Sequence, residues 1–333
     1  MKRSLKALLL AGALGLAAAV PAHAGGSSKD PVPLPTEFRH NRIFVVAKAP
    51  DGTPVSFYTD SGGGFNAIRS SVAKRLGLAE QTEADGDTGK SMRWTRYPAF
   101  MVQSGIPRPH WEPGLKGRLV VTDEDLFEVD GFLGGRWFAG RVWMIDYPAS
   151  TLSLLPPGWN KPADLAERRA PLGFHTTAKG RRDMHFPRIT VGVDGEEIDM
   201  LFDTGATVQL TEASGTAQGL AAGTRVGASF ITKSTFEKWT RRHPDWQVVE
   251  RGETIKEKTV PMIEVPRITV GGQTVGPVWF TQRSDANFRE WMSQWMDKPI
   301  DGALGGSALK YFRVIVDYPG SAAYFWPTTS TGK

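Results

Sequence analysis

The stretch Val55-Ser-Phe-Tyr-Thr-Asp60-Ser-Gly-Gly63 has a counterpart 143 residues further on, Ile198-Asp-Met-Leu-Phe-Asp203-Thr-Gly-Ala206. In each copy an Asp-Gly pair stands nine residues before the aspartate, between runs rich in β-branched and aromatic residues. An Asp-Gly pair in that setting is typical of a hairpin turn. Each copy is therefore predicted to be a β-hairpin whose second strand ends at the aspartate.

Two further motifs are repeated at an offset of 171 residues. Asp130-Gly-Phe-Leu-Gly-Gly135 matches Asp301-Gly-Ala-Leu-Gly-Gly306, and Asp146-Tyr-Pro148 matches Asp317-Tyr-Pro319. Correlated repeats of this kind predict two structural copies within one chain. The difference between the offsets gives the second copy 28 extra residues. We expect them within 211–252, a stretch that includes a predicted helix over 235–242.

The sequence also suggests where the copies begin and end. A basic start, an apolar run and a small-residue cleavage site are typical of a secretory signal peptide, and Pro156-Pro-Gly-Trp-Asn-Lys-Pro162 predicts a linker. The expected organisation is a signal peptide at 1–24, a flexible N-terminal segment at 25–37, a first lobe at 38–157, a linker at 158–170, a second lobe at 171–328 and a tail at 329–333. We therefore expect a periplasmic or secreted protein.

Composition narrows the classes of function. The 333-residue chain has a net charge of +5 and no cysteine. Three of the cations lie in the leader, so the mature chain carries only about +2, which argues against a nucleic-acid partner. Without cysteine there are no disulfides, thiolate metal sites or cysteine nucleophile. No His-Glu-x-x-His spacing occurs, so no metal is expected, and no second apolar stretch predicts a membrane span in the mature chain.

The repeated aspartates suggest acid–base chemistry. A small hydroxyl residue and a glycine after each aspartate permit close backbone approach at the end of a strand. If the copies meet around a twofold axis, Asp60 and Asp203 converge, and two carboxylates about 3 Å apart share one proton. The charged member can then deprotonate a water while the protonated member polarises a substrate carbonyl. This chemistry requires no cofactor.

Together the motifs resemble the paired signatures of the pepsin-like and retropepsin-like aspartic peptidases, over about residues 38–328. The resemblance implies a mainly β fold with two homologous, closed β-barrel-like lobes, an interlobe cleft and a few short helices, as in two fused retropepsin-like lobes of a bacterial enzyme. It implies that Asp60 and Asp203 are catalytic and that the neighbouring residues Ser61, Gly62, Thr204 and Gly205 form supporting loops. The implied substrate is a polypeptide. Because both half-sites lie in one chain, we expect a monomer.

Several alternatives stay open at this stage. The aspartates could merely cap turns of a duplicated scaffold, or the protein could be a catalytically inactive peptide-binding or scaffold protein of the same fold. Glycoside hydrolysis also uses two carboxylates, but not usually from duplicated Asp-hydroxyl-Gly loops. Arg93-Trp-Thr-Arg-Tyr-Pro98 could form part of a flap over the site or an ordinary loop. The segment 286–296 is expected to be a helix docked on the core, with a cleft-lining or lipid-facing role as the alternatives.

Overall fold

The structure is a computed structural model that describes residues 29–84, 91–110, 117–123, 129–255 and 258–328. The predicted signal peptide, residues 25–28 and the tail at 329–333 lie outside the described residues. The protein is mainly β, which confirms the predicted class. No sheet among the described residues closes into a barrel, so the expectation of closed barrels is wrong at this level. Each sheet instead keeps two edge strands.

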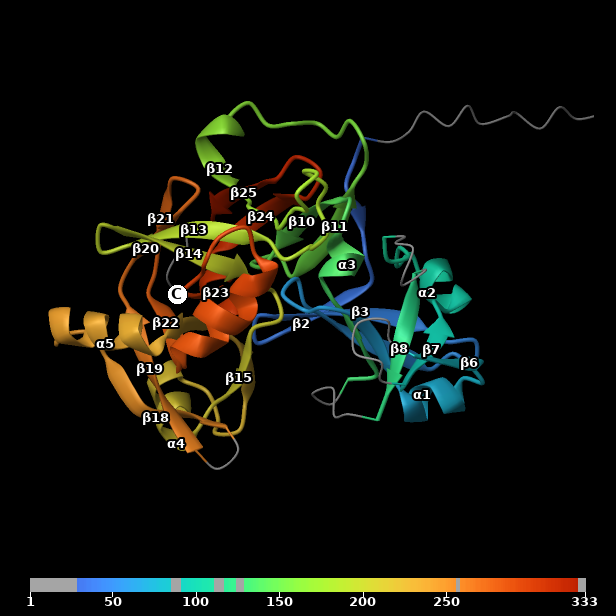
Figure 1. The fold of residues 1–333 in the computed structure, drawn as a ribbon, viewed down its shortest axis with the longest axis horizontal. Coiled ribbons are helices and arrows are strands. Elements are labelled where there is room, and N and C mark those ends of the chain that lie inside the picture. Colours follow the sequence, from blue (N-terminus) through green and yellow to red (C-terminus); the bar gives the residue numbers. More distant parts are fainter. Residues whose placement is uncertain (1–28, 85–90, 111–116, 124–128, 256–257, 329–333) are drawn as a thin grey trace, which may run out of the picture.

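The first half of the chain forms an eight-stranded sheet in the order β2-β3-β4-β9-β5-β8-β7-β6 (Figure 1). Its strands are β2 (Thr36–Arg39), β3 (Arg42–Lys48), β4 (Pro54–Thr59), β5 (Asn66–Arg69), β6 (Glu80–Ala84), β7 (Ser91–Arg96), β8 (Arg118–Thr122) and β9 (Gly131–Leu133). We call this sheet and its helices α1 (Ser70–Arg75), α2 (Ala99–Gln103) and α3 (Gly135–Phe138) the first lobe. Strand β9 lies between β4 and β5, parallel to the former and antiparallel to the latter.

The second half forms a nine-stranded sheet in the order β21-β20-β13-β14-β23-β17-β22-β19-β18. Its strands are β13 (Arg188–Val193), β14 (Glu196–Phe202), β17 (Ser229–Thr232), β18 (Val248–Ile255), β19 (Lys258–Val265), β20 (Ile268–Val270), β21 (Gln273–Val275), β22 (Val278–Arg283) and β23 (Gly302–Leu304). We call this sheet and its helices the second lobe. Strand β23 lies between β14 and β17 with the same directions as β9 between β4 and β5. The strand order from β3 to β6 thus repeats from β13 to β18.

A third sheet contains strands from both halves. Its order is β1-β11-β10-β24-β25-β12, and it lies across the upper part of Figure 1. Its strands are β1 (Val32–Pro33), β10 (Val142–Asp146), β11 (Thr151–Leu155), β12 (Arg169–Pro171), β24 (Phe312–Asp317) and β25 (Ala322–Pro327). The antiparallel pair β10 and β24 at its centre joins the two halves, and Arg313 forms an ion pair with Asp146 across it at 2.8 Å. The predicted domain boundaries stay a prediction, since this sheet is common to both halves.

The second lobe carries the extra residues of the repeat. Strand β5 begins six residues after Asp60, whereas β17 begins twenty-six residues after Asp203. The intervening chain forms β15 (Thr207–Gln209), α4 (Glu212–Gln218) and β16 (Arg225–Gly227). A side-chain capping box at Thr211 begins α4, and Gly219 ends it in the left-handed region. Most of the 28 extra residues thus lie between Asp203 and β17, which overlaps the start of the predicted stretch 211–252.

Helices follow equivalent strands in the two lobes. The helix α1 follows β5, and the longer α5 (Lys233–Arg242) follows β17. The helix α6 (Gly306–Leu309) in the second lobe matches α3 in the first, and η1 (Ala166–Arg168) lies in the predicted linker. The predicted helix over 286–296 is instead a π-helical turn, η2 (Ala286–Met292), followed by a 3-10 turn, η3 (Ser293–Trp295). Phe288 and Met296 are buried, but Trp291 is 67% exposed, so the predicted docking on the core does not include that residue.

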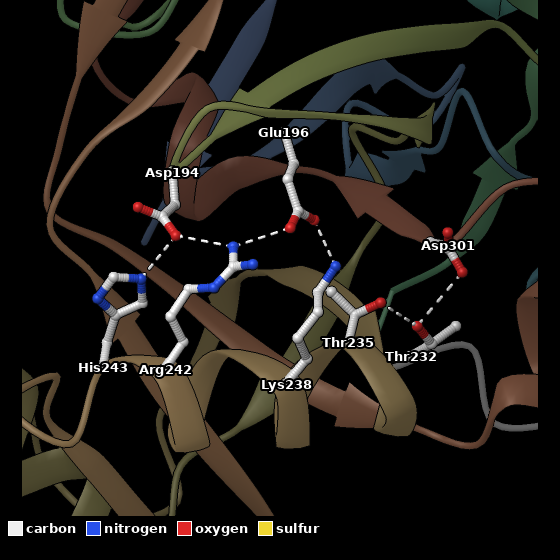
Figure 2. A network of polar contacts seen from close by, with 8 residues as sticks. All are labelled: Asp194, Glu196, Thr232, Thr235, Lys238, Arg242, His243 and Asp301. Carbon is white, nitrogen blue, oxygen red and sulfur yellow. Dashed lines mark hydrogen bonds and ion pairs between the residues drawn. The ribbon is translucent and has the colours of Figure 1, made fainter.

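Helix α5 is held to its lobe by a chain of charged contacts (Figure 2). Arg242 donates to Asp194 at 3.0 Å and to Glu196 at 2.8 Å, and Lys238 contacts the same glutamate. The ring of His243 lies 2.7 Å from Asp194 through Nε2. Because Asp194 is in the turn between β13 and β14, these contacts hold the hairpin that leads to Asp203.

One large core runs through both halves. It contains the buried strands of all three large sheets, with the rings of Trp137 and Trp143 4.5 Å apart near its middle. A continuous apolar core of this kind holds the two lobes in a fixed relation. Among the described residues, no helix has the length and apolar character needed to cross a membrane.

Candidate active site

Each repeated aspartate lies immediately beyond the end of a buried strand. Asp60 follows β4, and its amide donates to the carbonyl of Leu133 at 2.9 Å. Asp203 follows β14, and its amide donates to the carbonyl of Leu304 at 2.9 Å. The parallel pairings β4 with β9 and β14 with β23 produce this match. The triplets Phe132-Leu-Gly134 and Ala303-Leu-Gly305 of the repeated motifs therefore lie beside the aspartate loops.

The loop after each aspartate folds back on the carboxyl group. The Gly62 amide donates to Oδ1 of Asp60 at 2.8 Å, and the Gly205 amide donates to Oδ1 of Asp203 at 2.8 Å. Both turns are thus stabilised by the same short contact, in which the aspartate accepts from the amide two residues on. Because an amide donor favours the charged form of a carboxyl, each loop partly offsets the cost of burying its own aspartate.

Ser61 and Thr204 join the two loops to each other. The Ser61 amide donates to Oγ1 of Thr204 at 3.1 Å, and the Thr204 amide donates to Oγ of Ser61 at 3.0 Å. The Ser61 hydroxyl also donates to the carbonyl of Phe202 at 2.7 Å, and Thr204 reaches the carbonyl of Thr59 at 3.4 Å. Both side chains are buried. Each loop is therefore hydrogen-bonded to the strand end of the opposite lobe.

This crossing brings the two carboxyl groups together. A Cβ atom on Gly205 would lie 2.1 Å from Cγ of Asp60, and one on Gly62 would lie 2.8 Å from Cγ of Asp203. Each carboxyl group therefore packs against the glycine of the other loop, where no side chain could fit. The structure thus brings together all six residues that the sequence singled out.

The electrostatics of the pair follow from its position between the lobes. Burial is the largest cause that raises the pKa of Asp60, and the charge of Asp203 raises it further. Burial also raises the pKa of Asp203, while its hydrogen bonds from the Gly205 and Ala206 amides lower it. The pair therefore keeps a proton at pH values where an isolated aspartate is ionised. Both residues retain some solvent exposure, so water can reach them.

The first loop has a glycine at position 63, where the second loop has Ala206, and the difference has a packing reason. A Cβ atom on Gly63 would lie 2.6 Å from the ring of Phe132 and 3.0 Å from Oδ2 of Asp60. At the position equivalent to Phe132 the second lobe has Ala303. The absence of a side chain at Gly63 thus accommodates the large ring of Phe132.

The possible flap residues do not reach the aspartates in the described structure. Trp94 packs against Ala67 and Val120, with the guanidinium of Arg118 4.7 Å from its ring centroid. The buried Tyr97 hydroxyl donates to the carbonyl of Pro107 at 3.0 Å. Residues 85–90, which join β6 to β7, lie outside the described residues. A flap role for 93–98 stays a prediction, but these two aromatic side chains belong to the lobe's interior.

Sequence reasoning missed two kinds of supporting residue. Asn66 accepts a hydrogen bond from the Gly134 amide at 2.8 Å, and Ser229 accepts one from Gly305 at 3.0 Å. An asparagine in one lobe and a serine in the other accept the equivalent hydrogen bond, so a comparison of identical residues does not detect them. Tyr58 was not singled out either, although its hydroxyl contacts the opposite lobe. Its position two residues before Asp60, on the same strand face, is a signal that could have found it.

A metal site was also considered. Within the described ranges, no group of three or more His, Asp or Glu side chains is arranged to hold a metal ion.

The chain has little similarity to known proteins. No protein-family model matches the sequence, and no curated protein matches it. Among solved structures, the chain is similar to conglutin gamma, "a unique basic 7S globulin from lupine seeds", with 11% identity and a TM-score of 0.42 over 90% of this chain and 95% of that one. A likeness this distant carries no conclusion about fold or function.

Proposed function

We propose that the protein is an aspartic-type endopeptidase of the pepsin-like and retropepsin-like kind, built from two homologous lobes. One observation carries the proposal: two carboxyl groups from duplicated loops each pack against the glycine of the other loop and are held by matching amide contacts. A turn-capping role accounts for neither their convergence nor their raised pKa values. The duplicated sheet order supports the same proposal, because equivalent strands of the two sheets lead into the two aspartate loops.

In the proposed reaction, the dyad holds one proton. The ionised member of the pair Asp60 and Asp203 takes a proton from a water molecule, and that water attacks the carbonyl carbon of a peptide bond. The protonated member donates its hydrogen bond to the carbonyl oxygen and stabilises the charge that develops there. The proton then passes to the leaving amine, and the bond between carbon and nitrogen breaks. The hydrogen bonds of Ser61 and Thr204 keep the two carboxyl groups in this geometry.

The substrate, in this proposal, is an extended polypeptide, and the protein acts as a monomer outside the inner membrane. Incubation of the mature chain with a diverse peptide library between pH 3 and 8, followed by mass spectrometry, tests the reaction. We expect cleavage by the unmodified chain and a loss of at least about 10³-fold in Asp60→Asn and Asp203→Asn, because either change removes one half of the acid–base pair. Asp51→Asn, a change at an exposed turn residue, serves as the matched control and is expected to keep full activity.

Two other results would point elsewhere. Peptide binding without cleavage at any pH, equal in the unmodified chain and in Asp203→Asn, would favour the peptide-binding alternative. Cleavage that persists in both aspartate variants would assign the activity to another site or to a contaminant. A peptide with a hydroxyl-bearing tetrahedral carbon in place of the scissile carbonyl provides a second test, because a transition-state mimic should bind far more tightly than the matching substrate.

A further inference from the structure

Tyr58 is a buried polar side chain next to the dyad that the proposed reaction does not use. It lies on β4 two residues before Asp60, with 1% of its surface exposed. Its ring packs against those of Phe44 and Phe132, with centroids 5.1 Å and 6.0 Å away. Alternate residues of a strand point to the same face, so its side chain lies on the same side as that of Asp60. Packing from both sides fixes the direction in which the hydroxyl points.

The Tyr58 hydroxyl makes its contacts in the opposite lobe. It lies 3.1 Å from the carbonyl oxygen of Gly205 and 2.6 Å from Oγ1 of Thr207. The Thr207 hydroxyl is itself 3.1 Å from the same carbonyl. Whichever hydroxyl donates to the carbonyl, Tyr58 takes part, either directly or through Thr207. The first lobe therefore holds the carbonyl of Gly205 in place.

The residue that carries this carbonyl also contacts Asp203. The amide of Gly205 donates to Oδ1 of Asp203 at 2.8 Å. Glycine has a wide range of backbone conformations, so a hydrogen bond that holds its carbonyl also restricts the direction of its amide. Tyr58 thus acts on Asp203 through the backbone of Gly205.

The other lobe has no equivalent of this contact. The residue two positions before Asp203 is Leu201, whose apolar side chain packs close to Gly62. A leucine side chain cannot form a hydrogen bond. At this position the second lobe therefore does not brace the loop after Asp60. The extra segment of the second lobe supplies the other partner, since Thr207 begins β15. The brace is therefore a one-sided feature within an otherwise duplicated site.

We propose that Tyr58 is a positioning residue whose hydroxyl holds Gly205 in place and so keeps the Gly205 amide directed at the carboxyl group of Asp203. The catalytic consequence rests on the proposed peptidase function, but the effect on ionisation does not. Other titratable or charged groups near the pair are the buried Tyr147 and Tyr318, and Arg42 near Tyr58. All three stay unchanged in the variants below.

The test compares Tyr58→Phe with Tyr97→Phe. Both changes delete one buried tyrosine hydroxyl of the first lobe and keep the ring, but the hydroxyl of Tyr97 bonds only within its own lobe, to Pro107. Carbon-13 NMR of labelled aspartate carboxyl groups follows the titration of the dyad without any need for activity. We expect the lower dyad pKa to rise by about 0.5 to 1 unit in Tyr58→Phe, because the carboxyl loses part of an amide hydrogen bond, and to stay unchanged in Tyr97→Phe.

Kinetics on a cleaved peptide give the second readout. We expect kcat to fall about tenfold in Tyr58→Phe with KM nearly unchanged, a smaller loss than the 10²- to 10³-fold cost of removing a donor that contacts the reacting atoms. The acidic limb of the pH–rate profile should move to higher pH by the same amount as the NMR titration. Carboxyl titrations that coincide in Tyr58→Phe and the unmodified chain would overturn the proposal. A chain that cleaves no peptide but shows the NMR shift would refute the proposed function and leave the brace standing.

Discussion

The two lobes have the same strand order around the dyad but differ in the side chains that contact the opposite lobe. Tyr58 in the first lobe occupies the position of Leu201 in the second. Gly63, which packs against Phe132, stands where the second lobe has Ala206, and Phe132 stands where it has Ala303. Backbone amide contacts to the two aspartates are nevertheless equal in length, at 2.8 Å in both loops. The comparison teaches that backbone geometry at the carboxyl groups is the constrained feature, while the surrounding side chains can diverge if their volumes compensate.

The largest expected effect comes from filling the space where the lobes meet. Gly205→Ala would place a Cβ atom 2.1 Å from Cγ of Asp60, whereas Gly62→Ala would place one 2.8 Å from Cγ of Asp203. We expect Gly205→Ala to lower kcat by at least about 10²-fold, because small displacements of catalytic groups have effects of that size, and Gly62→Ala to lower it less. Steady-state kinetics on a cleaved peptide measure both.

Gly64, two residues after Gly62, provides the control for this comparison. A Cβ atom on Gly64 would have only the ring of Phe186 nearby, at 3.8 Å. Gly64→Ala should therefore keep nearly full activity. Equal losses in Gly62→Ala and Gly205→Ala would show that the two loops are interchangeable, against the difference in packing described above.

An intermediate effect is expected from changes in side-chain volume at Gly63 and Phe132, where the second lobe has two alanines. Gly63→Ala should lower the free energy of unfolding by about 1 to 3 kcal/mol, because its new methyl group overlaps the ring of Phe132. In a Phe132→Ala background the same change should cost less, with a coupling energy of at least about 0.5 kcal/mol. Urea denaturation of the four proteins of this cycle, analysed at constant m value, measures the coupling. Simple additivity of the two changes would contradict the proposed compensation.

The smallest effect concerns the hairpin turn that precedes each aspartate loop. The pKa of Asp194 is lowered below the ordinary value of 3.8, first by its contact with His243 and then by that with Arg242. A lowered carboxyl pKa stabilises the folded state above the unfolded pKa, and this contribution disappears as the pH falls through the folded pKa. Asp194→Asn should therefore lower the melting temperature slightly at pH 6, and the gap to the unmodified chain should close below pH 3.8.

The equivalent turn of the first lobe provides the comparison. Asp51 accepts hydrogen bonds from Thr53 within its own turn and forms a longer ion pair with Arg75, at 3.6 Å, whereas Asp194 contacts Arg242 at 3.0 Å and His243 at 2.7 Å. We expect Asp194→Asn to be more sensitive to salt than Asp51→Asn, because contacts between exposed charges are screened. Melting curves at low and high ionic strength check this. Equal salt dependence in the two variants would mean that the contacts of α5 in Figure 2 contribute nothing to the stability of the hairpin.

Most elements near the dyad could be predicted from local signals. The strands that end at Asp60 and Asp203 carry alternating or continuous apolar residues and follow Asp-Gly turns, which act over a few residues. Helix α1 ends at Arg75, and Gly77 two residues later is a local signal for its end. The turn at 286–292 was missed, because a π-helical winding depends on how Phe288 packs against the lobe rather than on spacing.

The residues of the candidate site likewise fall into those that the sequence reveals and those that it does not. The identities of the six loop residues were available from two short repeated motifs. The brace at Tyr58 was not, because its partners Gly205 and Thr207 lie about 150 residues away and no periodicity links them. The role of Gly63 was likewise hidden, since the sequence does not reveal that Phe132 lies against it. The openness of the sheets was also missed, because closure of a sheet depends on strand twist and edge pairing summed over many residues.

The sequence by itself determined that the chain is a duplicated, mainly β protein with one Asp-hydroxyl-Gly loop in each copy. Local turn chemistry and hydrophobic patterning act over short distances, so they can be recognised directly in the chain. Only the tertiary structure decided that the two loops cross, that each carboxyl group packs on the glycine of the other loop, and that Tyr58 contacts the loop after Asp203 while Leu201 makes no matching hydrogen bond. Those contacts depend on how two separately formed hairpins meet across a common core, and no local signal specifies that geometry.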